Sequence, residues 1–125
     1  MSKFEAIVKQ LAQAVTRLEE VLREPASDIV KDSAIQRFEF SLDLAWKTIK
    51  SYLAEQKGVV VNSPKEAFRE AYRQGLAEYE DKWLVMVDLR NETVHTYSQK
   101  LADEIYSQLP SFLPLFKSLL AKLGG

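Results

Sequence analysis

The residues best suited to chemistry lie in one stretch, Arg90-Asn91-Glu92-Thr93-Val94-His95-Thr96-Tyr97. It holds the only histidine of the 125 residues, with an arginine five positions before it and a tyrosine two positions after it. Neutral imidazole can take the proton of a ribose 2′-hydroxyl, and imidazolium can protonate a leaving oxygen. A guanidinium binds phosphate and stabilises charge on a pentavalent phosphorus. The set therefore favours metal-free acid–base cleavage of a phosphodiester.

The spacing of Arg90 and His95 limits how they can share a substrate. A helix turns by about 100° per residue, so residues five apart point roughly 140° away from each other. The two side chains converge only if the helix breaks between them or if the site combines two copies of the chain. The threonines near His95 and the serine at position 98 favour a break or a new N-cap. A symmetric dimer would also bring two histidines together as acid and base.

The same residues have a structural interpretation. An arginine or a histidine near a helix end commonly forms an ion pair with a carboxylate or binds the last carbonyls of the helix. Asn91-Glu92-Thr93 matches a glycosylation acceptor, which we interpret as a coincidence in a cytoplasmic chain. We interpret the acidic clusters, such as Glu78 to Asp81, as solvated faces rather than catalytic dyads. Spacing alone leaves the structural and the catalytic interpretation open.

The composition excludes several kinds of site. Residues 1–125 have the length of one globular domain, and the chain is 46% hydrophobic and 28% charged. It has no cysteine, so disulfides and thiolate metal sites are excluded, and one histidine makes a zinc site unexpected. We expect no metal and no cofactor. With a net charge of -1, any contact with RNA must be local and transient.

We expect a cytoplasmic protein. The first residues turn charged at once and lack the apolar core of a signal peptide. No apolar run approaches the roughly 20 residues that a membrane-spanning helix needs.

Hydrophobic periodicity predicts helices on both sides of the central stretch. Apolar residues recur every three or four positions from Phe4 to Leu22, and Pro25 ends this first helix. Ser27 or Asp28 can cap a long second helix over 29–57. Its off-stripe apolar residues fit either a central helix with several neighbours or a face that meets another subunit. They are Phe40, Leu44 and Tyr52.

Three further helices complete the prediction. Ser63-Pro64-Lys65-Glu66 predicts a helix start with a capping box, followed by four inward-facing residues, Ala67, Phe68, Ala71 and Tyr72. A fourth helix begins near residues 79–81, and its apolar run 83–87 predicts burial on most sides. The last runs over 99–123 as one helix bent at Pro110. The sum is an all-α, antiparallel, up-and-down bundle of about five helices.

The Arg90–Tyr97 stretch resembles the R-x4-H-x-Y motif of HEPN-domain proteins of the HepT type. The rest of the chain is similar to the branch called nucleotidyltransferase substrate-binding proteins. The shared stretches are Phe38–Lys47, Ser63–Ala67, Ala102–Tyr106 and Leu113–Leu115. The resemblance implies a helical bundle that forms a homodimer and works with a small nucleotidyltransferase.

The resemblance also implies roles for single residues. In toxin–antitoxin versions the HEPN protein is a metal-independent endoribonuclease acting on RNA such as tRNA or mRNA. Arg90 and His95 would then be the catalytic pair, and Asn91 a supporting polar residue. Tyr97 would be the hydroxyl that the partner modifies with AMP from ATP. The name of the branch implies an alternative, a non-catalytic subunit that positions substrate for a separate nucleotidyltransferase.

Overall fold

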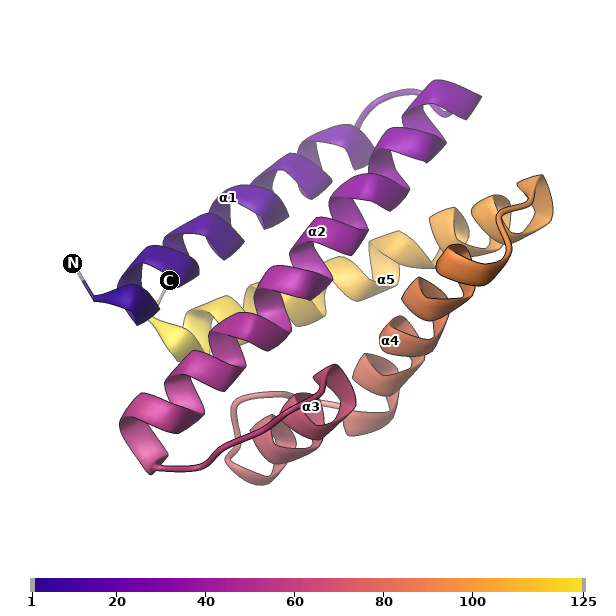
Figure 1. Cartoon of the computed structure of the whole chain (residues 1–125). Helices are drawn as coiled ribbons and strands as arrows, with labels where there is room; N and C mark the ends of the chain where they lie inside the picture. The colour runs from indigo at the N-terminus through magenta and orange to yellow at the C-terminus, as the bar shows by residue number, and fades with distance from the viewer. Residues whose placement is uncertain (1, 125) are drawn as a thin grey trace.

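The structure is a computed structural model, and it describes residues 2–124 of the chain. This part contains α1 (Lys3–Leu22), α2 (Asp28–Tyr52), α3 (Pro64–Arg73), α4 (Glu80–His95) and α5 (Gln99–Leu123). One turn of π-helix, η1 (Leu53–Lys57), continues α2, and residues 2–124 contain no strand. Helices α1, α2, α4 and α5 run alternately up and down, with the short α3 between α2 and α4 (Figure 1). The predicted all-α up-and-down bundle is confirmed.

Serine side chains start four of the five helices. Ser27, Ser63 and Ser98 each accept a hydrogen bond from the backbone N–H three residues later, at 3.1–3.2 Å. The predicted capping box differs in one respect, because the Glu66 carboxylate accepts from the N–H of Asn62, at 2.6 Å, rather than from Ser63. Helix α4 has no side-chain cap. Two acidic residues in its first turn instead interact favourably with the positive end of the helix dipole.

Helix α2 is the centre of the bundle. It contacts each of the other four α-helices, which confirms the interpretation of a central helix with several neighbours. Two polar side chains on it are fully buried, and each donates to the carbonyl one turn earlier, Ser41 to Arg37 and Thr48 to Leu44. Phe40 is 57% exposed, so one apolar side of α2 stays uncovered in the single chain.

Two predictions about burial were wrong. Tyr72 is 50% exposed, because it lies roughly 80° from the middle of the face that Ala67, Phe68 and Ala71 bury. Val85 is 43% exposed, because it lies on the side of α4 opposite Trp83, two residues away. The run 83–87 is therefore buried on one side only, and α4 is a surface helix along its outer face.

An aromatic cluster joins α2, α3, α4 and α5 in the core. The rings of Phe68 and Trp83 stack with centroids 4.6 Å apart, and Phe116 meets Trp83 edge-on at 5.2 Å. Phe38 packs against Phe112 at 5.9 Å and against Phe116 at 6.5 Å. Phe112 and Phe116 keep this position because α5 continues as one helix through both prolines, as predicted. The cluster fixes α3 and α4 onto the α2–α5 pair.

No helix in residues 2–124 combines the length and the hydropathy needed to cross a membrane.

We expect Trp83→Ala to lower the free energy of unfolding by about 3–5 kcal/mol, because it leaves a cavity at the centre of the aromatic cluster. Trp83→Phe should cost much less, since it keeps a ring and removes an indole N–H that has no partner within residues 2–124. Urea unfolding measures both. The exposed Val85→Ala on the same helix is the control and should change stability by less than about 0.5 kcal/mol. Equal losses for Trp83→Ala and Val85→Ala would contradict this role.

Candidate functional site

Helix α4 carries Arg90, Asn91 and His95 without interruption, and His95 is its last residue. The chain leaves the helix at Thr96, and Ser98 then caps α5. The break that the sequence allowed between Arg90 and His95 therefore lies after His95. Within one chain the two side chains line different hollows.

Arg90 lies between α2 and α4 at a small hollow of about 210 Å³. Asp43, Trp46 and Asn91 line the same hollow. The Arg90 side chain is 37% exposed, and its Nε lies 3.8 Å from a carboxylate oxygen of Glu39 on α2. At this distance the pair is loose, so the guanidinium can turn toward an added phosphate.

The environment of Glu39 also weakens this pair. Burial raises the pKa of the Glu39 carboxyl above its ordinary value, and the nearby positive charge of Arg90 only partly opposes this. Ionisation of the Glu39 carboxyl therefore costs free energy at this position, and its pair with Arg90 contributes little stability. No pattern in the sequence indicates that Glu39 is a neighbour of Arg90, because the two residues lie on helices far apart along the chain.

His95 faces the other side of α4, at an open hollow of about 680 Å³ between α4 and α5. Three carboxylates line this hollow together with Asn91 and Lys100. They belong to Asp88, Glu92 and Glu104. Asp88 is paired with Lys65 of α3 at 2.7 Å. Asn91 is thus the one candidate residue that lines both hollows, and the carboxylates make the His95 side unfavourable for a bare polyanion.

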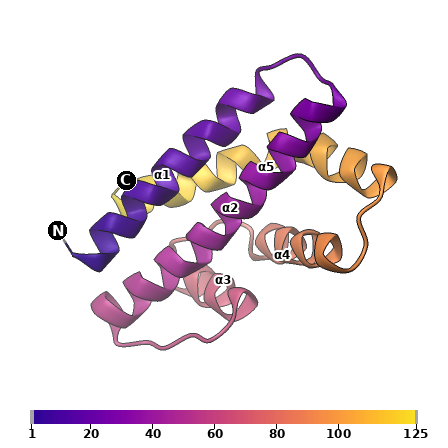
Figure 2. The same ribbon diagram turned by 45° about the horizontal axis from the view of Figure 1, so that its top comes forward.

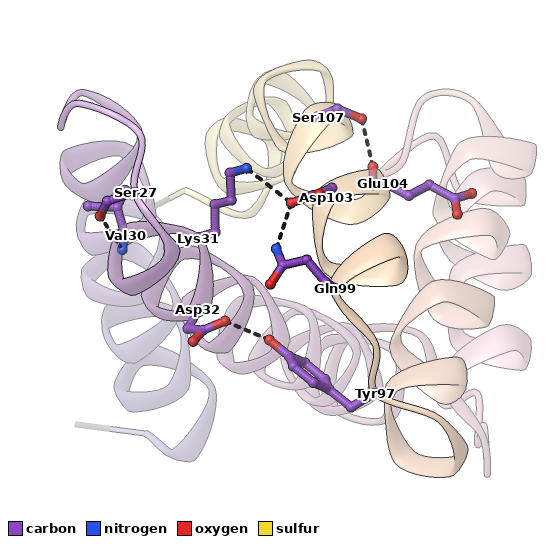
Figure 3. A network of polar contacts seen from close by, with 9 residues as sticks. All are labelled: Ser27, Val30, Lys31, Asp32, Tyr97, Gln99, Asp103, Glu104 and Ser107. Atoms are coloured by element: carbon purple, nitrogen blue, oxygen red, sulfur yellow. Dashed lines mark hydrogen bonds and ion pairs between the residues drawn. The ribbon is translucent and has the colours of Figure 1, made fainter.

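Tyr97 lies in the connector between α4 and α5 and is 57% exposed. Its hydroxyl donates to a carboxylate oxygen of Asp32 at the start of α2, at 2.8 Å (Figure 3). This hydrogen bond, with a smaller contribution from burial, raises the pKa of the Tyr97 hydroxyl. The phenol is therefore protonated, fixed in direction and accessible to solvent. Asp32, like Glu39, was not found from the sequence.

A second polar contact lies beside the connector and joins α2 to the first turns of α5. Lys31 of α2 forms an ion pair with Asp103 of α5 at 3.0 Å, and the Gln99 amide donates to the same carboxylate at 2.9 Å (Figure 3). The connector lies at the end of the bundle away from the α2–α3 connection (Figure 2). It is attached to α2 by exposed polar contacts rather than by buried apolar side chains.

Within residues 2–124, no group of three or more histidine, cysteine or acidic residues is arranged to hold a metal ion.

Comparison with known proteins identifies the family. Residues 1–124 match the family described as "nucleotidyltransferase substrate binding protein like". The chain is 37% identical over 106 residues to a Haemophilus influenzae protein named probable ribonuclease HepT, covering 76% of this chain and 70% of the relative. The chain belongs to the HepT-like nucleotidyltransferase substrate-binding family. The resemblance found in the sequence is confirmed.

Two solved structures share the fold of this HepT-like chain. A crystal structure of a Thermus thermophilus protein has a TM-score of 0.84 at 37% identity, covering 90% of this chain and 98% of that one. A Haemophilus influenzae protein has a TM-score of 0.67 at 30% identity, covering 98% of this chain and 97% of that one. That structure is described as revealing the fold of a substrate-binding domain of a nucleotidyltransferase.

We expect Glu39→Gln to leave the free energy of unfolding at neutral pH unchanged or slightly raised, within about 1 kcal/mol. The raised pKa means that the folded chain binds the Glu39 proton more tightly than the unfolded chain. The stability that comes from this proton is complete below the ordinary glutamate pKa and is lost as the pH rises through the raised pKa of Glu39. Glutamine is uncharged at every pH, so the variant avoids this loss at neutral pH.

Urea unfolding at acidic and at neutral pH checks the expectation, with Glu92→Gln on the exposed side of α4 as the control. A loss of more than about 1 kcal/mol at neutral pH for Glu39→Gln would show that its pair with Arg90 stabilises the fold.

Proposed function

We propose that this chain is the HepT-like partner of a minimal nucleotidyltransferase in a toxin–antitoxin type system, and that it is a metal-independent endoribonuclease. The observation that carries the proposal is the placement of Arg90, Asn91 and His95 within two turns of one helix, each lining a hollow on its surface. The relative named probable ribonuclease HepT supports the same chemistry.

The proposed site combines two copies of the chain. Arg90 and His95 lie on an unbroken helix and line different hollows, which favours a site in which the Arg90 and the His95 that act on one phosphate come from two copies. Exposed apolar side chains on α2 and α4, Phe40 at 57% and Val94 at 64%, offer surface for a second copy. In a symmetric dimer each helix α4 would meet its counterpart. Such a pair would supply two imidazoles and two guanidinium groups.

The reaction would follow from these groups. The 2′-oxygen of a ribose attacks the adjacent phosphorus, while one His95 takes the hydroxyl proton. The bond from phosphorus to the 5′-oxygen breaks, and the His95 of the second copy, as imidazolium, protonates that oxygen. Arg90 binds the phosphate and stabilises the added negative charge, and Asn91 can donate to the same oxygens. The products are a 2′,3′-cyclic phosphate and a free 5′-hydroxyl.

We expect purified protein, free of its partner, to cleave total tRNA or mRNA in the presence of EDTA. His95→Ala and Arg90→Ala should each lower the cleavage rate by about 100-fold or more, because His95 transfers the proton and Arg90 stabilises the added charge in the transition state. Arg69→Ala, an exposed arginine on α3, is the matched control and should cleave normally. Sedimentation of each variant tests the dimer. Cleavage that survives in His95→Ala would overturn this site.

Tyr97 is the proposed acceptor for AMP. Its exposed hydroxyl would attack the α-phosphorus of ATP on the nucleotidyltransferase, forming a phosphodiester as pyrophosphate leaves. Asp32, which accepts the hydroxyl hydrogen, is placed to take the proton. Once AMP is attached, the Tyr97 oxygen has no hydrogen to donate to Asp32, so the hydrogen bond between connector and α2 would be lost, and the added phosphate charge would repel Asp32.

We expect the chain to gain the mass of one AMP when it is incubated with the nucleotidyltransferase and ATP, and Tyr97→Phe to gain nothing. Tyr72→Phe, another half-exposed tyrosine, should be modified like the unchanged chain. Intact mass spectrometry gives the result. Modification of Tyr97→Phe to the same extent would exclude Tyr97 as the acceptor.

A second candidate function is a non-catalytic subunit that positions substrate for the nucleotidyltransferase. The family description and the substrate-binding-domain relative favour it, and so do the carboxylates around His95. This function predicts no cleavage of RNA, and it predicts loss of nucleotidyltransferase activity when Arg90 or Asn91 is changed. The EDTA cleavage assay therefore separates the two.

A further inference from the structure

Trp46 lines two hollows on the surface beside α2. It is half-buried and lines the 210 Å³ hollow that holds Arg90 and Asn91. It also lines a second hollow of about 410 Å³ toward the C-terminal end of α2. Lys3 of α1 and Lys47 and Lys50 of α2 line this second hollow. The indole is thus placed between the proposed catalytic arginine and a group of lysines.

The lysines in this group are suited to bind an anion. Lys50 lies over the Trp46 ring, with Nζ 5.7 Å from the centroid. Within residues 2–124 neither Lys3 nor Lys50 forms an ion pair, whereas Lys47 pairs with Asp43 at 2.9 Å. Two positive charges therefore form no ion pair on this surface, where the Glu55 carboxylate also lines the hollow. By contrast, the hollow at His95 is lined by three carboxylates and one lysine.

The spacing on α2 makes these residues one stripe. Residues 39, 43, 46 and 50 follow each other at intervals of three or four, and residue 47 lies four after 43, so all five share one face of the helix. A helix rises about 1.5 Å per residue, so the stripe from Glu39 beside Arg90 to Lys50 spans roughly 16 Å. This is room for a few nucleotides of an extended strand.

We infer that Trp46, Lys47, Lys50 and Lys3 form a binding track for single-stranded RNA that leads away from the phosphate at Arg90. A base stacks on the Trp46 indole and displaces the Lys50 ammonium, which then pairs with a neighbouring phosphate. Lys3 contacts the next phosphate along the strand. The inference rests on the proposed endoribonuclease function and names how its substrate is held. The track uses a few local positive charges, so it can bind RNA although the net charge of the chain is -1.

The test is the binding of a short fluorescent single-stranded RNA, measured by anisotropy over a series of salt concentrations. Each ribose carries a 2′-O-methyl group, so the strand binds without being cleaved. Trp46→Ala should weaken binding by about tenfold, and Trp46→Phe should restore most of it, because a phenyl ring still stacks. Lys50→Gln should lower the slope of log affinity against log salt by about 0.7.

Two controls separate binding from folding. Lys9→Gln removes an exposed lysine of α1 away from the track and should leave affinity and salt slope unchanged. Circular dichroism and thermal unfolding show whether Trp46→Ala folds. Lys50 is exposed, so Lys50→Gln should fold normally. It therefore still tests the track if Trp46→Ala fails to fold.

The outcomes distinguish this inference from the proposed function. Track-dependent binding by a chain that cleaves no unmodified RNA would support the track and contradict the nuclease. Cleavage by the unchanged chain, with normal binding in Trp46→Ala and Lys50→Gln, would overturn the track alone. An absence of RNA binding overturns the track too. So does a loss of nucleotidyltransferase binding in Lys50→Gln without any change in RNA affinity, because the surface would then bind protein.

Discussion

The burial of the Trp83 indole between Phe68 and Phe116 holds α4 in the bundle, and α4 carries every candidate catalytic residue. Its buried residues end at Leu89, so the helix is anchored by its first half. Beyond that point the side chains are half-buried or exposed, and Arg90 forms a loose ion pair with Glu39 of α2 at 3.8 Å. Exposed ion pairs contribute at most about 1 kcal/mol each, far less than a buried aromatic side chain. The candidate site is therefore on the weakly held half of a firmly anchored helix.

This arrangement suits a surface that is completed by another molecule. Arg90 and Asn91 face α2, His95 faces α5, and the exposed edge of α4 between them carries Val94. The connector is attached to α2 by the Tyr97 hydrogen bond, and the α5 turn that follows it by the Lys31–Asp103 ion pair, and water can replace both contacts. A second copy or a nucleotidyltransferase could bind here without disturbing the aromatic core, because that core lies at the other end of α4.

The charge of the chain is unevenly distributed around the same helix. Three carboxylates and one lysine line the hollow at His95, whereas three lysines and the single carboxylate of Glu55 line the hollow beyond Trp46. A net charge of -1 averages over these two sides and hides the difference. Both functions proposed for the family would use the Arg90 side to hold a phosphate. They differ in whether His95 reaches the same substrate.

The helices and the family could be predicted from the amino-acid sequence. Serine caps, Pro25 and the three-to-four-residue apolar period act over a few residues, so they predicted the order and approximate bounds of α1 to α5. The stretch Arg90 to Tyr97, together with the shared stretches in the second, third and last helices, indicated a HepT-like chain. Local rules failed where burial depends on a neighbouring helix, at Tyr72 and Val85, which are exposed.

The groups that surround each candidate residue follow instead from the tertiary packing. Glu39 beside Arg90, Asp32 at Tyr97 and the position of Trp46 between two hollows depend on how α2 packs against α4 and its connector. The packed structure also shows that α4 continues through His95, whereas the sequence allowed a break before it. Such contacts join residues far apart along the chain, and no periodicity or spacing encodes them. They arise from the packing of whole helices around the aromatic core.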